Sequence, residues 1–282
     1  MLQEKKLNYG TERKMWKRNT DDPLMRTFLD KYHLNLLAIP RENVAVGDLY
    51  IMDKAQRIST SGKIIYFLEP PLEIPQLNID ESMADVSGML SKGLSIQEGF
   101  ELLEGFLSAF GAIGILDKVR VSYELKKANT MKFRFADTTR DSVDALLLGS
   151  KLIRHTIIED HPLYEKGYRY YLVTAVVRTS SISITAESDE NKILDIDVDA
   201  MSIGENTTGI SVKKSSETEM MFIGKKKLTF GVELYELIYD KKRKKLELKI
   251  PEGLIKTMGS SKIPIEPAFI GGPDDNTHIK VE

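Results

Sequence analysis

A two-residue alternation of apolar and polar side chains dominates the second half of this chain and constrains its fold more than any other feature. The segment at 168–188 reads YRYYLVTAVVRTSSISITAES, and similar patterns recur at 219–224, 227–239 and 244–250. Successive side chains of a strand point to opposite faces of a sheet, so this period predicts strands. Polar, turn-like residues separate the segments. The pattern therefore predicts a β-rich second half.

The first half of the chain mixes helix and strand patterns. Apolar residues at helical spacing predict the longest helix at 82–116. Glycines recur inside it, and each costs a helix up to about 1 kcal/mol relative to alanine, so this helix is predicted to be only moderately stable. Strands are predicted at 34–40, 48–52, 63–68, 119–125 and 131–137, with a short helix at 142–154.

Charge and composition exclude several classes of protein. The formal net charge is −2, so no nucleic-acid partner is expected. Cysteine is absent, which excludes disulfides, thiol nucleophiles, cysteine-ligated zinc and a lipidated cysteine. No stretch approaches the roughly 18 apolar residues of a membrane-spanning helix, and the N-terminus lacks a signal-peptide pattern. We expect a chain that is soluble as synthesised and crosses a membrane, if at all, by strands.

Catalytic and metal-binding signatures are missing. The histidines are scattered without zinc-ligand spacing, no G-x-S-x-G motif occurs, and DIDVDA at 195–200 lacks the glycine and glutamate of a calcium loop. Asp137, Arg140 and Asp141 fit either a polar site or a turn with a helix cap. We therefore expect no enzyme, no cofactor and no metal. The histidines are His33, His155, His161 and His278.

Two basic clusters stand out. One lies in a predicted turn and the other between two predicted strands. Each fits a solvated hairpin tip, and each also fits contact with anionic lipid headgroups, worth on the order of 1 kcal/mol per basic residue. The first cluster is Lys225, Lys226 and Lys227, and the second is Lys241, Lys242, Arg243, Lys244 and Lys245.

The last 30 or so residues mix proline, glycine and isolated apolar residues without a regular period. Such a segment is either disordered or laid across another surface, and its apolar residues favour the second, because free tails are usually poorer in them. Its predicted anchors are Ile263, Ile265, Phe269 and Ile270. The preceding stretch, 251–262, is rich in glycine, serine and lysine and is predicted to be exposed.

The order of segments resembles the bacterial gasdermins. The resemblance covers about Asp21 to Ile250 and rests on DDPLMRTFLDKYHLNLLAIPRENVAVGDL, the glycine-rich segment at 83–124, FRFADTTRDSVDALLLGSKL, YYLVTAVVRTSSISITAES and LTFGVELYELIYD. It implies an α+β fold, with a twisted, mostly antiparallel central β-sheet flanked by helices and a C-terminal peptide wrapped over the body.

The resemblance also implies a function. Such a chain is a cytoplasmic monomer until a caspase-like or trypsin-like protease removes its C-terminal peptide. The cut is expected in the exposed stretch 251–262, whose candidate residues are Pro251, Glu252, Gly253, Lys256 and Lys262. The cleaved chain then forms homo-oligomeric pores in the cell membrane and causes cell death, as a defence against phage. The organisation is a basic extension (1–20), a pore-forming body (21–250) and an autoinhibitory tail (251–282). Bacterial gasdermins commonly carry a lipidated N-terminal cysteine, which this chain lacks. The alternative is a soluble α+β module that regulates a partner.

Overall fold

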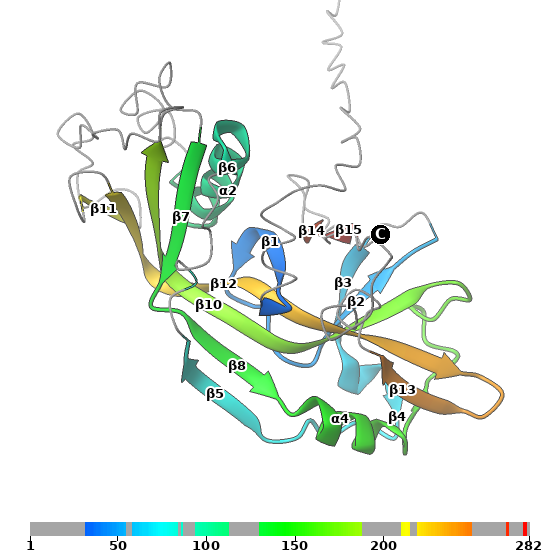
Figure 1. The fold of residues 1–282 in the computed structure, drawn as a ribbon. Helices are drawn as coiled ribbons and strands as arrows, with labels where there is room; N and C mark the ends of the chain where they lie inside the picture. The colour runs from blue at the N-terminus through cyan, green and yellow to red at the C-terminus, as the bar shows by residue number, and fades with distance from the viewer. Residues whose placement is uncertain are drawn as a thin grey trace, which may run out of the picture.

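Two long, bent strands form the spine of the molecule (Figure 1). β10 (Arg169–Glu187) and β12 (Glu219–Asp240) pair antiparallel from Tyr170↔Leu237 to Thr185↔Glu219. The pairing shifts register at three places along β10, between Val173 and Ala175, between Val177 and Arg178, and between Thr179 and Ser181. Such irregularities bend strands and increase their twist, which lets one ribbon serve two differently oriented halves of a sheet.

The computed structural model describes residues 32–54, 58–83, 86, 94–112, 130–187, 210–214, 219–249, 269–270 and 279–280. Within them, short strands line both edges of the spine. On the β10 side lie β2 (Asp48–Met52), β8 (Thr139–Val143) and β7 (Thr130–Ala136), followed outward by β3 (Ile58–Lys63), β5 (Leu77–Ser82) and β6 (Leu94–Ser95). On the β12 side lie β13 (Lys245–Lys249), β1 (Asn35–Arg41) and β11 (Ile210–Lys214), and β14 (Phe269–Ile270) and β15 (Ile279–Lys280) continue outward from β1. β4 (Leu68–Glu69) and β9 (Thr156–Ile157) form a separate pair.

Two helices and one 3-10 turn complete the described part: α2 (Ile96–Ala109), α4 (Ala145–Leu152) and η1 (Ile64–Tyr66). Asp144 caps α4, because its carboxylate accepts hydrogen bonds from the backbone N–H groups of Leu146 (2.8 Å) and Leu147 (2.9 Å). Neither helix has the length and apolar character needed to cross a bilayer. The predicted α+β fold with a mostly antiparallel central sheet is confirmed.

The alternation along the strands places apolar residues on both faces of the sheet. One face packs under the helices. Leu103 and Phe106 of α2 belong to the same core cluster as Leu36 and Phe230, and Leu148 of α4 belongs to a second cluster. The opposite face carries a separate cluster of nine buried residues from β1, β2, β10, β12 and the segment after β1. These are Leu37, Val44, Tyr50, Met52, Tyr171, Val173, Val176, Val232 and Leu234.

Several local predictions were wrong at their boundaries. Ser82 is the last residue of β5, and α2 begins only at Ile96, so the helix predicted at 82–116 is shorter. The strand predicted at 63–68 lies earlier, as β3, and 64–66 form η1. Ser142 pairs with Ala175 in β8, so the short helix starts three residues later than predicted. For Ser82 and Ser142 the cause is pairing between remote strands, which overrides local propensity. The strand predicted at 119–125 lies outside the described residues.

Candidate functional site

The second basic cluster forms the tip of the β12–β13 hairpin, as predicted. Asp240 shapes the turn, because its carboxylate accepts hydrogen bonds from the backbone N–H groups of Lys242 (2.9 Å) and Arg243 (3.1 Å). The four turn residues, 241–244, are exposed, and Lys245 begins β13. The tip therefore presents a compact group of cations to the solvent.

One cation of the hairpin tip is held by the neighbouring loop. Lys241 Nζ lies 2.5 Å from a carboxylate oxygen of Glu159, and Tyr239 donates a hydrogen bond of 3.0 Å to the same carboxylate. The hydrogen bonds from Lys241 and Tyr239 lower the pKa of Glu159 below its ordinary value. The hairpin is thus anchored at its base while its other basic side chains face the solvent.

The first basic cluster does not lie in a turn, and that prediction was wrong. Lys225, Lys226 and Lys227 are exposed residues within the continuous strand β12. They bulge there, since β10 advances only from Thr179 to Ser181 while β12 moves from Leu228 to Ile223. Lys226 forms an ion pair with Glu42, and Lys227 Nζ lies 3.5 Å from Thr139 Oγ1. The cluster therefore lies in β12 at the bend of the spine and not in a loop.

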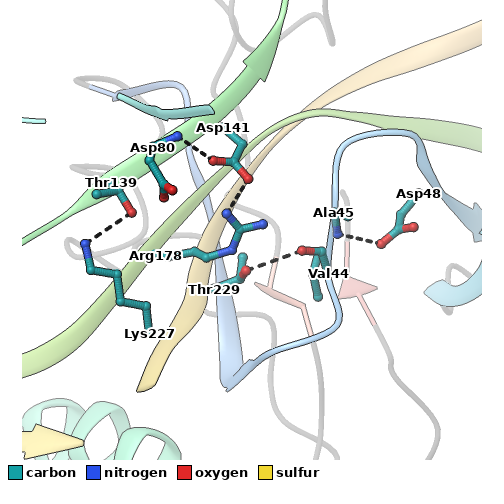
Figure 2. A network of polar contacts seen from close by, with 9 residues as sticks. All are labelled: Val44, Ala45, Asp48, Asp80, Thr139, Asp141, Arg178, Lys227 and Thr229. Atoms are coloured by element: carbon teal, nitrogen blue, oxygen red, sulfur yellow. Dashed lines mark hydrogen bonds and ion pairs between the residues drawn. The ribbon is translucent and has the colours of Figure 1, made fainter. Parts of the chain in front are cut away.

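A network of charged side chains ties β8 to the spine (Figure 2). Arg140 and Asp141, two of the three residues that fitted either a polar site or a turn, belong to it, whereas sequence patterns did not indicate their partners. Asp141 accepts a hydrogen bond from the backbone N–H of Asp80 (2.9 Å) and forms an ion pair with Arg178. Arg140 reaches across β10 to Glu233, with 2.6 Å between nitrogen and oxygen. A parallel contact joins Arg169 to Glu236 through two hydrogen bonds of 2.7 and 2.9 Å.

The network consists of paired charges that hold neighbouring strands together. Burial raises the pKa of Glu233, against the opposing effect of Arg140. Burial also disfavours ionisation of Asp141, but the hydrogen bond from Asp80 and the contact with Arg178 outweigh it and lower the pKa of Asp141. Each of these two carboxylates forms an ion pair with a guanidinium group, Glu233 with Arg140 and Asp141 with Arg178. No group of three or more histidine, aspartate or glutamate residues within the described segments is arranged to hold a metal ion.

Replacing Asp141 with asparagine is expected to destabilise the protein at neutral pH by about 1.5–3 kcal/mol, the usual contribution of a hydrogen bond to a charged group. Because the folded pKa of Asp141 is lowered, its contribution is complete above the unfolded value of about 4 and is lost as pH falls through the folded value. Urea unfolding of Asp141→Asn and wild type at pH 7 and pH 3 measures this. A stability difference that persists unchanged at pH 3 contradicts it, and the exposed Asp160→Asn is the matched control.

The C-terminal tail contacts the outer edge of β1. Leu37 pairs in parallel with Ile270 of β14, and β14 pairs antiparallel with β15 through Phe269↔Lys280 and Ile270↔Ile279. Figure 1 shows both short strands beside β1 and β3. β1 therefore lies between β12 and the tail. Of the predicted anchors, Phe269 and Ile270 lie in β14, whereas Ile263 and Ile265 lie outside the described residues. So do the extension 1–20 and the cleavage-region residues Pro251, Glu252, Gly253, Lys256 and Lys262.

Comparison with known proteins identifies the family. The sequence model of the Bacterial Gasdermin Family matches residues 37–254. The chain is 24% identical over 223 residues to a gasdermin from Vitiosangium sp., covering 77% of this chain and 81% of that protein. It is 23% identical over 236 residues to a gasdermin from a Desulfuromonadales bacterium, covering 79% of this chain and 84% of that protein.

A solved structure supports the same fold. The bacterial gasdermin from Bradyrhizobium tropiciagri superposes with a TM-score of 0.60 at 20% identity, covering 82% of this chain and 92% of that chain. The family model spans most of the chain, and the resemblance seen in the sequence is confirmed. The chain therefore belongs to the Bacterial Gasdermin Family, whose members form pores and are not enzymes.

Proposed function

We propose that this chain is an autoinhibited pore-forming protein. Its tail, residues 251–282, holds the body (21–250) in a closed, monomeric state in the cytoplasm. A caspase-like or trypsin-like protease cuts within 251–262, the body then oligomerises in the inner membrane, and the permeabilised cell dies, which limits phage spread. The family supports the general part of this proposal, which is pore formation involving oligomers and membrane lipid. No nucleic acid takes part.

The observation that carries the autoinhibitory role is the position of β14 on the edge of β1. An exposed strand edge offers unpaired N–H and C=O groups to any other strand, and an added strand satisfies them. A tail that binds only the closed body stabilises that state by its own contact energy, and a preference of about 5.5 kcal/mol changes a population from 1:99 to 99:1. Cutting the chain before β14 makes this contact intermolecular, so the peptide is free to dissociate.

The basic hairpin tip supports the membrane part of the proposal. Lys242, Arg243 and Lys244 are exposed at the end of a hairpin whose base is fixed by the Lys241–Glu159 ion pair. Near an anionic membrane, each basic residue gains on the order of 1 kcal/mol. Strands that enter lipid must have every backbone group paired, so insertion requires a closed ring of many copies.

We test the proposal with a variant that carries a thrombin recognition sequence in place of residues 256–261. It is mixed with dye-filled vesicles of phosphatidylethanolamine and phosphatidylglycerol, and thrombin is added. We expect dye release only after cleavage, and much less from vesicles of phosphatidylcholine, because the membrane contact is electrostatic. Wild type with thrombin and the variant without thrombin are the controls. If the cleaved protein stays folded by circular dichroism and releases no dye, the proposal fails and the soluble regulatory module takes its place.

A further inference from the structure

Five strands of the sheet form one continuous row from β5 to β1. In one register line, Leu36 pairs with Gly231, which pairs with Val177, which pairs with Arg140, which pairs with Glu81. A second line runs from Arg41 through Thr229, Arg178 and Thr139 to Ser82. β14 extends this row beyond β1 at Leu37↔Ile270. The tail therefore occupies one end of the row, and β5 forms the other end.

Strand direction relates the two ends. The steps from β5 to β8, β10, β12 and β1 are four antiparallel pairings, so β5 and β1 run in the same direction. β14 also runs parallel to β1. If a second copy is placed beside the first by a shift along the row, its β5 meets β1 in the direction that β14 has in the intact chain. β14 of the tail and β5 of a neighbouring copy would thus run in the same direction beside β1.

The β5 end is open. Among the described residues β5 pairs with β8 alone, and residues 78–82 are exposed, with Ile79 at 65%. Asp80 has a positive φ of 53° at an irregularity in the β5–β8 register. Bulges and charges on an edge strand discourage unspecific pairing, which keeps intact chains apart. An exposed isoleucine between polar neighbours nevertheless leaves apolar area for a specific partner.

The charges at the two ends are complementary. Asp80 and Glu81 make the β5 end acidic. At the β1 end, Arg41 is followed by Glu42, whose carboxylate binds Lys226 from the bulge of β12, and the exposed Lys225 adjoins it. Ser82, which follows Glu81, lies on the same register line as Arg41. A shift of one copy along the row therefore brings its acidic β5 residues beside the basic residues at the β1 end of the next copy. Complementary charges of this kind fix register between partners.

The geometry points to a second copy of this chain as the partner of the β1 edge: once the tail is released, β5 of a neighbouring copy takes the place of β14. This inference rests on the proposed function and adds the surface through which copies meet. The contact is heterologous, since one end of the row binds the opposite end of the next copy. Repeated heterologous contacts generate a ring when the rotation closes. The tail blocks assembly because it occupies the same edge.

Engineered disulfides test this contact cleanly, because the chain contains no cysteine of its own. Neighbouring strands lie about 4.8 Å apart, within the Cα separation that a disulfide spans. We introduce Ser82→Cys and Ile39→Cys together into the thrombin-cleavable chain. Ser82 is exposed, and Ile39 lies between Leu36 and Arg41, whose register lines end at Glu81 and Ser82. Cross-linking by a mild oxidant and dye release are measured in the same vesicle sample.

We expect a ladder of cross-linked copies after cleavage and none from the uncut chain. Mixing the two single-cysteine proteins gives dimers only. The matched control pairs Ser82→Cys with Ser150→Cys, on the exposed surface of α4 away from the row, and gives no ladder. Glu81→Cys with Ile39→Cys covers a register one residue away, and far-UV circular dichroism confirms that each variant is folded.

The outcomes separate the contact from the pore. A ladder without dye release supports the contact and counts against pore formation. Dye release without a ladder from either cysteine pair overturns the contact and leaves the proposed function standing. If uncut protein cross-links as much as cleaved protein, the contact is also overturned, because the tail then does not block the β1 edge. If neither pair cross-links and no cleaved protein releases dye, both proposals fail.

Discussion

Replacing Ile270 with proline is expected to make the uncut chain release dye from anionic vesicles. Ile270 pairs with Leu37 on one side and with Ile279 on the other, so its N–H group belongs to one of the two ladders. Proline removes that N–H group and fixes φ near −65°, which is suited to neither ladder. Each loss of about 1.4 kcal/mol in tail binding raises the open population about tenfold. The measurement is dye release by uncut Ile270→Pro against uncut wild type.

Two controls separate this effect from a general loss of stability. Ile270→Val keeps a β-branched side chain and the N–H group, so the uncut variant should remain closed. Urea unfolding of Ile270→Pro should give a body stability close to that of wild type, because β14 contributes only two residues to the sheet. An uncut proline variant that stays folded and releases no more dye than wild type contradicts a restraining role for β14.

Replacing Phe135 with alanine is expected to cost about 3–5 kcal/mol of unfolding free energy, the usual loss for a buried phenylalanine. Phe135 of β7 is 1% exposed, and its ring stacks on Phe230 of β12 with centroids 4.3 Å apart and 12° between planes. β7 pairs with β10 at Ile182, on one side of the bend. Phe230 lies on the other side, between Thr229 and Gly231, which pair with β10 before its bend. The stack therefore joins the two halves of the sheet across the bend.

Urea denaturation followed by circular dichroism measures this loss as a lower midpoint with an unchanged slope. Leu146→Ala is the matched control: Leu146 is 87% exposed on α4, so its loss should change stability by less than about 0.5 kcal/mol. A Phe135→Ala protein that unfolds at the wild-type midpoint would show that the stack does not hold the two halves together.

Elements that depend only on neighbouring residues were predictable from local sequence patterns. The two-residue period of 168–188 predicted β10, and the polar run at 241–244 between two apolar segments predicted the β12–β13 turn. Both depend on neighbouring residues only: side chains alternate across a strand, and Asp240 bonds to the backbone a few residues on. The resemblance carried by the order of segments predicted the family, which the comparisons confirm.

Features that join distant segments became apparent only in the folded chain. The lysines at 225–227 have a turn-like composition, but β12 continues through them because it pairs with β10 on both sides of the bulge. On its other edge it pairs with β11 before the bulge and with β1 after it. Asp141 meets Arg178, and Arg140 meets Glu233, because β8 aligns with the middle of β10. The pairing of Ile270 with Leu37 spans nearly the whole chain. Such contacts depend on register between remote strands, which no local pattern encodes.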